Sequence, residues 1–331
     1  SICSECKACE TACQSQAIRH EQKDELLSLP VSAVIIAAGG DVSGDLPPEF
    51  GYGSSPNIVT SMEYERILAA SGPFQGHVQR PFDGMTPNRI AFIQCAGSRD
   101  QRCQAEYCSA VCCMYAVKEA VITREHLPSV RDIDIFYMDI RAYGKDFDYS
   151  VATARSKYGI GFIKSRVAEI AENKATGKIG VKYCGADGRM AVAEYDLVVL
   201  AVGFVPKAEL QPFLAQTGIK TDRYGFCWIN EMEAPNTSWT GITACGVAAG
   251  PKDIPETVVE ASAAAAAAAR IALKTDLGLG SGTEANGADF YADGAVSCAG
   301  YFQVEAPAPL RDVTKEPPRI GVFLCHCGIN I

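Results

Sequence analysis

The sequence lacks the features that would place it in a membrane or on nucleic acid. No apolar run approaches the roughly 20 residues that a membrane-spanning helix needs, and no signal peptide opens the chain. A basic excess is also missing, because 30 Lys and Arg stand against 39 Asp and Glu, which gives a net charge of −9. That charge argues against nucleic acid as the main partner.

Charged residues are also few. They make up 21% of the 331 residues, whereas hydrophobic residues make up 48%, so we expect a packed chain rather than disorder. The length leaves room for two domains. An initiator Met is absent and cysteines lie close to both ends, so we expect the sequence to be an internal piece of a longer polypeptide.

Cysteine is the one residue type in clear excess, with 15 copies. Disulfide scaffolds place cysteines in short loops, whereas long aliphatic runs separate the groups here. The isolated cysteines 184, 227, 245 and 298 are interpreted as small buried hydrophobic residues. The other assigned cysteines form three groups: Cys3, Cys6, Cys9 and Cys13; Cys95, Cys108, Cys112 and Cys113; and Cys325 and Cys327.

The first group has the spacing C-x2-C-x2-C-x3-C, which is the run of bacterial ferredoxins. We interpret Cys3, Cys6 and Cys9 as ligands of one [4Fe–4S] cluster and Cys13 as a ligand of a second cluster, both completed upstream of this chain. A zinc knuckle remains an alternative, although this spacing crowds a tetrahedral ion.

The rest of the chain alternates between strands and helices. Residues 31–37 and 196–202 are near-continuous apolar runs that predict buried parallel strands. Residues 89–95 and 132–138 are expected to be further strands, with a helix from Cys113 between them. Residues 89–138 thus form a β-α-β unit, which commonly binds a dinucleotide.

The first turn of this unit does not suit a nicotinamide cofactor. A G-x-G-x-x-G loop is expected after Cys95, but the sequence there has only Gly97, and cysteines lie in the loop and at the helix start. A metal cluster needs thiolates, whose pKa the helix dipole would lower. We infer that an iron–sulfur cluster replaces the nicotinamide, while a zinc site or a set of buried thiols stays open as an alternative.

An Ala-rich helix is expected over residues 258–274. A glycine turn precedes it, and two other glycine turns follow strands. This combination is typical of flavoproteins with two dinucleotide-binding domains. Val247 stands where such proteins commonly carry an Asp, so that contact is lost or supplied elsewhere. The predicted cofactor-binding residues are Gly39, Gly40, Gly203, Phe204, Gly246, Val247, Lys252, Asp253, Ile254 and Thr257.

The chain resembles the HdrA family of heterodisulfide reductase subunits over about residues 1–272. The segments that carry the resemblance are SMEYERILAASG at 61–72, CAGSRD at 95–100, YCSAVCCMYA at 107–116, FYMDIRA at 136–142 and GPKDIPET at 250–257. In that family a ferredoxin module interrupts a thioredoxin-reductase-like FAD domain, so the resemblance implies that this chain starts inside the insert.

The resemblance also implies roles for single residues. Cys95, Cys108, Cys112 and Cys113 match the ligands of an unusual cluster, and Cys103 falls outside the pattern. Lys118 matches a lysine near the flavin ring and is our expected catalytic residue, because a cation there tunes the flavin potential. Cys325 and Cys327 resemble the start of a further cluster domain.

The fold class we expect is α/β: a thioredoxin-reductase-like flavoprotein with two dinucleotide-binding domains and part of a ferredoxin-like insert. The expected domains are 1–22 (ferredoxin module), 23–88 (FAD-domain segment), 89–205 (Rossmann-like domain with a cluster), 206–274 (second FAD-domain segment), 275–318 (linker) and 319–331 (start of a further domain).

The expected function is electron transfer through FAD and [4Fe–4S] clusters in a cytoplasmic complex. By resemblance, the partners are HdrB- and HdrC-like proteins, electron-input proteins of hydrogenase or dehydrogenase type, and ferredoxin. The reaction implied is flavin-based electron bifurcation, and the alternative is a relay or scaffold protein that does not bifurcate. An NAD(P)H-dependent disulfide reductase is disfavoured, because no C-x-x-C lies beside the expected flavin.

Overall fold

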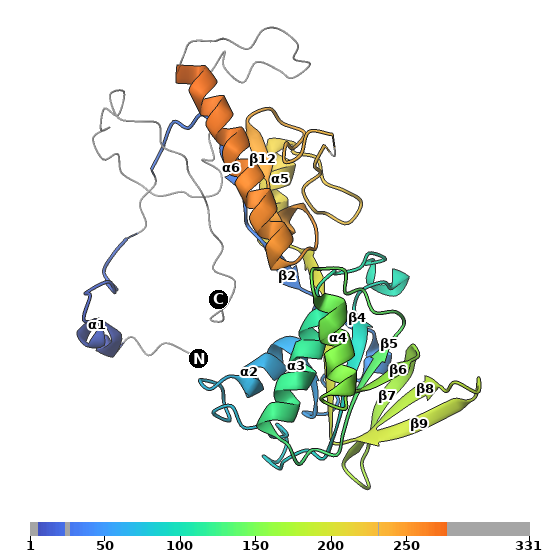
Figure 1. The fold of residues 1–331 in the computed structure, drawn as a ribbon. Coiled ribbons are helices and arrows are strands. Elements are labelled where there is room, and N and C mark those ends of the chain that lie inside the picture. The colour runs from blue at the N-terminus through green and yellow to red at the C-terminus, as the bar shows by residue number, and fades with distance from the viewer. Residues whose placement is uncertain (1–5, 24–26, 231, 277–331) are drawn as a thin grey trace.

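The largest sheet is built around the apolar runs of the sequence. The computed structural model describes residues 6–23, 27–230 and 232–276 (Figure 1). Five strands run parallel in the order β3-β10-β4-β5-β6. These strands are β3 (Ile58–Thr60), β10 (Leu197–Val202), β4 (Arg89–Ala96), β5 (Asp132–Tyr137) and β6 (Gly161–Lys164).

Helices cover one face of this sheet. Ile90 and Phe92 of β4 and Val199 of β10 belong to a core that includes residues of all three helices. Tyr64 of α2 is fully buried there, and its hydroxyl lies 2.6 Å from the Thr123 hydroxyl of α3. The helices are α2 (Ser61–Leu68), α3 (Cys112–His126) and α4 (Phe147–Ser156).

A second, antiparallel sheet covers the other face. Ala91 and Ile93 of β4 and Val198 of β10 pack with Ile170 and Val181 from this sheet. Because β10 is buried on both sides, none of its residues is exposed, which explains its continuous apolar run. The covering strands are β7 (Val167–Asn173), β8 (Lys178–Cys184) and β9 (Met190–Tyr195).

A smaller unit forms around β1 (Val34–Ile36) and β12 (Ile242–Ala244), which pair in parallel. The helix α6 (Ile254–Asp276) contacts both strands. The antiparallel pair of β2 (Gly40–Val42) and β11 (Phe204–Pro206) connects this unit to the end of β10. The remaining elements are α1 (Ala8–Ala12), η1 (Pro48–Phe50), η2 (Gln101–Cys103), η3 (Ala208–Leu210), α5 (Gln211–Thr217) and η4 (Gly246–Ala249).

The expected strands and helices are present with small shifts in their ends. The helix α6 begins at Ile254, four residues before the expected start, because Asp253 and Glu256 cap it reciprocally: the Glu256 amide donates to Asp253 Oδ1 at 2.8 Å. Residues 23–88 contribute elements to more than one sheet. None of the helices in the described ranges is long and apolar enough to cross a membrane.

Candidate functional site

Four thiols gather where β4 leads into α3. Cys95 lies at the end of β4, Cys108 lies in the connecting loop, and Cys112 and Cys113 open α3. Cys112 interacts electrostatically with the other three. All four are free thiols rather than disulfide partners. The structure therefore brings together the four cysteines that the resemblance singles out.

Two backbone amides donate to sulfur atoms of this group, one from the loop before α3 and one from the segment after β5. Cys95 and Ala110 are non-glycine residues in the left-handed region, with φ values of 59° and 61°. The Ala110 amide donates to Cys108 Sγ at 3.4 Å, and the Arg141 amide donates to Cys113 Sγ at the same distance. Such donors stabilise negative charge on sulfur, so the loop is prepared for thiolates.

Burial opposes ionisation of these thiols. Desolvation raises the pKa of Cys95 to about 11 and that of Cys112 to about 12, and it also raises the pKa of Cys113. Desolvation is the largest influence on each of these thiols, so the net shift of their pKa is upward. A metal that binds here has to displace protons.

A single metal ion and a polynuclear cluster differ in how closely they bring the ligand sulfur atoms together. Within residues 6–23, 27–230 and 232–276, no three His, Cys, Asp or Glu side chains form a group that could hold one metal ion. A tetrahedral zinc site would bring its sulfur atoms to within about 3.8 Å of one another. A cluster spaces its cysteines more widely, and the buried hydroxyls of Ser98 and Ser109, which have no partner, can accommodate a polar group beside them.

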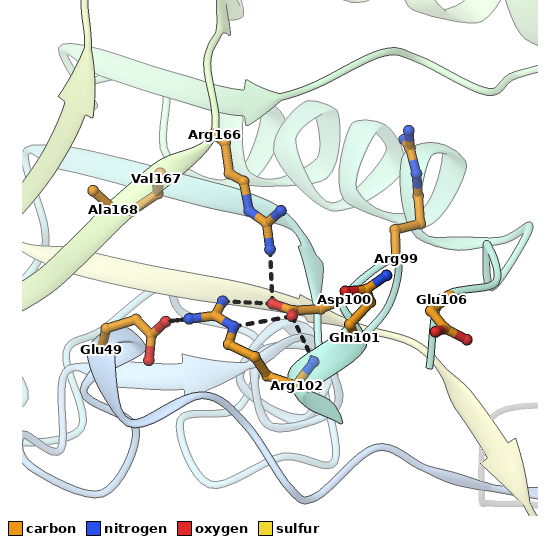
Figure 2. A pocket seen from close by; sticks show the side chains of 9 residues that line it. All are labelled: Glu49, Arg99, Asp100, Gln101, Arg102, Glu106, Arg166, Val167 and Ala168. Carbon is orange, nitrogen blue, oxygen red and sulfur yellow. Dashed lines mark hydrogen bonds and ion pairs between the residues drawn. The ribbon is translucent and has the colours of Figure 1, made fainter. Parts of the chain in front are cut away.

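An ion network holds the loop between Cys95 and Cys108 (Figure 2). Asp100, only 6% exposed, accepts from Arg102 Nε at 3.0 Å and from Arg166 Nη2 at 2.7 Å. Arg102 also pairs with Glu49. These groups line a cavity of about 710 Å³, which also includes Arg99 and Glu106. Asp100 belongs to the CAGSRD segment, but nothing in the sequence indicates that Arg166 pairs with it.

The cysteines outside the three groups differ in their environments. Cys103 has Asp100, Arg102, Asp45 and Arg166 as charged neighbours, so it lies in the ion network. Cys227 and Cys245 are buried as expected, whereas Cys184 is exposed at the end of β8, so its predicted burial is wrong. Cys298 lies outside the described residues.

The ferredoxin run is described only in part. Cys9 Sγ lies 3.0 Å from His20 Nε2, and Cys13 Sγ lies 3.3 Å from the Ser15 hydroxyl. Cys6 and Cys9 are exposed. Among the described residues, Cys6, Cys9 and Cys13 do not form a group that could hold a metal ion. Cys3, Cys325 and Cys327 lie outside the described residues.

Lys118 has a partner that its sequence context does not indicate. Its ammonium donates to Glu65 Oε1 of α2 at 3.1 Å, and the side chain is 61% exposed. The adjacent Glu119 is fully buried, and neither carboxyl oxygen has a partner. Burial raises the pKa of Glu119 well above its ordinary value, and the nearby Glu65 adds to this. Burial therefore favours the neutral, protonated form of Glu119.

Two of the predicted flavin glycines are required by contacts within the chain. A Cβ on Gly40 would lie 2.5 Å from the Val247 side chain, and a Cβ on Gly203 would lie 1.7 Å from the Ser109 hydroxyl. Phe204, next to Gly203, accepts from the Tyr107 hydroxyl through its carbonyl at 2.9 Å. Gly39, in contrast, has a left-handed φ of 72°.

The turn before α6 is also largely satisfied internally. Lys252 donates to the carbonyls of Gly246 and Gly250 at 2.7 and 2.8 Å, and Thr257 Oγ1 donates to the Asp253 carbonyl at 2.7 Å. A Cβ on Gly250, where φ is 136°, would meet nothing within 4 Å, and the Ile254 side chain is 76% exposed. Gly250 and Ile254 thus form an accessible part of this turn.

The match to a described protein family defines the class of residues 110–265. The family described as pyridine nucleotide-disulphide oxidoreductase matches residues 110–265. The solved structure of a thioredoxin reductase from Lactococcus lactis is similar, at 20% identity and a TM-score of 0.46. The match covers 73% of this chain and 66% of that one. The chain carries an oxidoreductase domain of this class.

The curated relatives are more specific. The HdrA subunit of the H(2):CoB-CoM heterodisulfide,ferredoxin reductase of Methanothermobacter marburgensis is 39% identical over 263 residues, which are 78% of this chain and 40% of that protein. The second HdrA iron-sulfur subunit of the CoB–CoM heterodisulfide reductase of Methanopyrus kandleri is 43% identical over 255 residues, which are 75% of this chain and 38% of that protein. Over the matched stretch, the chain belongs to the HdrA family of heterodisulfide reductase subunits. It spans about 40% of the length of these relatives.

Proposed function

We propose that this chain is part of the FAD- and iron–sulfur-containing electron-transfer subunit of a heterodisulfide-reductase-like complex. The gathering of Cys95, Cys108, Cys112 and Cys113 at the β4–α3 turn carries the proposal. In this class of fold, that turn is where a nicotinamide dinucleotide would meet the helix. Four cysteines at this turn would provide thiolate ligands in place of a phosphate-binding site.

These four residues would hold a [4Fe–4S] cluster, which supplies one-electron transfer when bound. The amides of Ala110 and Arg141 stabilise the ligand sulfurs by donating to them. Asp100 fixes the loop between the first two ligands through Arg102 and Arg166.

Flavin chemistry would link two-electron donors to one-electron carriers. We assign Lys118 as the residue beside the flavin ring, with Glu65 orienting its ammonium. On the α6 side, Gly250 and Ile254 are accessible to a ring, while Lys252, Asp253 and Thr257 hold the turn in shape. Gly39, Gly40, Gly203, Phe204, Gly246 and Val247 complete the set that shapes the flavin side.

The ferredoxin run would carry electrons onward. We assign Cys3, Cys6, Cys9 and Cys13 to [4Fe–4S] clusters of a ferredoxin module, and Cys325 and Cys327 to a further one. The partners would be HdrB- and HdrC-like proteins, a hydrogenase- or dehydrogenase-type input protein, and ferredoxin. The buried free thiols of Cys227 and Cys245 support a reducing compartment, for which we propose the cytoplasm.

The reaction we propose is bifurcation of a flavin electron pair between ferredoxin and a higher-potential disulfide. The test is potentiometry of the flavin in the purified complex. Crossed one-electron potentials are expected, and normally ordered potentials would favour the alternative of a simple relay. Metal analysis belongs to the same test: zinc without labile sulfide would refute the cluster assignment.

A further inference from the structure

Two buried polar side chains beside Cys95 lack hydrogen-bond partners. Gln94 is 7% exposed, and neither its Oε1 nor its Nε2 has a partner; Ser98 is 2% exposed, and its hydroxyl has none. Buried polar groups almost always have a partner, because an unpaired group keeps its full desolvation cost. Their environment therefore calls for a further polar group.

Both side chains line one small cavity with Cys95. Its volume of about 10 Å³ corresponds to about one water molecule. Phe50, Ile93 and Phe136 contribute apolar side chains to the lining of this cavity. Ser165 also lines the cavity, but its hydroxyl already accepts from the Cys184 amide at 3.2 Å.

The backbone explains why these residues share a cavity. Neighbouring residues of a regular strand point to opposite faces. Cys95 instead has a left-handed φ of 59°, and the register of β4 against β10 shifts between Leu200 and Val202. Gln94 and Cys95 therefore both line the cavity, and Ser98, whose amide donates to the Cys95 carbonyl, closes the turn over it.

We propose that Gln94 and Ser98 hold one ordered water that donates a hydrogen bond to the Cys95 sulfur and thereby raises the reduction potential of the cluster. The inference rests on the proposed function, which makes Cys95 a ligand. A buried water needs two to four polar partners, and the amide, the hydroxyl and the sulfur supply three. Hydrogen bonds to ligand sulfurs favour the reduced, more negative state.

The test compares Gln94→Met, Ser98→Ala and the double variant in the full-length complex. Methionine and alanine remove the polar atoms with little change of shape, so folding should persist. Ser150→Ala, which removes an exposed α4 hydroxyl, is the control. The cluster signal is assigned by its loss in Cys108→Ser, and its potential is followed by electron paramagnetic resonance.

Each single variant should lower the equilibrium constant for cluster reduction about tenfold, which lowers the reduction potential by about 59 mV for one electron. Since both side chains hold the same water, the double variant should shift it no further. Electron–nuclear double resonance in D₂O should show one exchangeable deuteron coupling in the wild type and the control that is missing from the three variants, whereas couplings from the Ala110 and Arg141 amides, which donate to other ligand sulfurs, should remain in all of them.

Three results would count against these statements. Unchanged potentials and deuteron coupling, with iron retained, would overturn the inference alone. Additive shifts would mean that Gln94 and Ser98 donate directly, which would overturn the water. A wild-type complex without any cluster signal that depends on Cys108 would overturn the proposed function itself.

Discussion

The Asp100 network offers a quantitative test of how the cluster loop is held. In Asp100→Asn, a buried carboxylate that accepts from Arg102 and Arg166 becomes a neutral amide. Charge-assisted hydrogen bonds contribute about 1.5–3 kcal/mol each when protected from water. Both arginines are about half exposed, at 54% and 52%, so the effective contribution falls to about 0.5–1 kcal/mol each.

Adding the cost of a buried amide facing two cations, we expect a loss of about 2–3 kcal/mol in the free energy of unfolding. For a folding unit of about 150–250 residues, this lowers the Tm by about 4–12 °C. Thermal unfolding followed by circular dichroism, with iron content measured in parallel, is the assay. Iron should also be lost, because the network positions the loop between Cys95 and Cys108.

Asp187→Asn is the matched control, because Asp187 lies exposed in the turn between β8 and β9 and accepts only from the Arg189 amide nearby. Its Tm should change by little. If Asp100→Asn unfolded at the same temperature as this control and kept its iron, the reasoning that the network holds the loop would be refuted.

Three further predictions concern packing, protonation and metal binding. Gly203→Ala should cost about 1–3 kcal/mol in urea unfolding, because its Cβ would lie 1.7 Å from the Ser109 hydroxyl; an unchanged midpoint would contradict this packing. As the pH rises above the ordinary pKa of a glutamate, the wild type should lose stability, because the folded state keeps the Glu119 proton and the unfolded state releases it. Glu119→Gln should remove this loss. Curves of urea stability against pH that run parallel for the two proteins would disprove the prediction. Cluster insertion into the metal-free protein at pH 8 should release protons, measured with a pH indicator, because the pKa values of Cys95 and Cys112 lie near 11 and 12; insertion without proton release would show that the thiols are already ionised.

Much of the central sheet could be predicted from the sequence. The run at β10 is entirely apolar and the run at β4 is mostly so, because the sheet is covered on both faces, and this makes both strands visible without a template. The covering sheet β7–β9 was not predicted. In β9 the apolar side chains of Met190 and Val192 are exposed while alanines occupy the half-buried positions, so hydrophobicity does not follow burial and gives only a weak signal.

The start of α2 carries a local signal in the sequence. Thr60 and Glu63 form a capping box at the start of α2, in which the Glu63 amide donates to the Thr60 hydroxyl at 3.3 Å. A Thr followed three residues later by Glu, before an apolar pattern, is visible in sequence. The family resemblance also runs through residues 61–72, but a resemblance indicates kinship and does not locate the start of a helix.

The site was predictable as a set of residue types but not as a set of contacts. The spacing of the second cysteine group left zinc and buried thiols open, and the resemblance selected the four ligands. Arg166 reaches Asp100 from 66 positions away and Glu65 reaches Lys118 from 53, distances over which no local pattern acts. The burial of Glu119 without a partner is likewise a property of the folded core.

Iron content of single cysteine variants tests the central claim most directly. In the full-length complex, Cys112→Ser should lose about four iron atoms and about four labile sulfides relative to the wild type. Cys103→Ser, in the same loop but within the ion network, should keep all of them. Equal iron in the two variants, or loss of zinc in place of iron, would contradict a cluster held by Cys95, Cys108, Cys112 and Cys113.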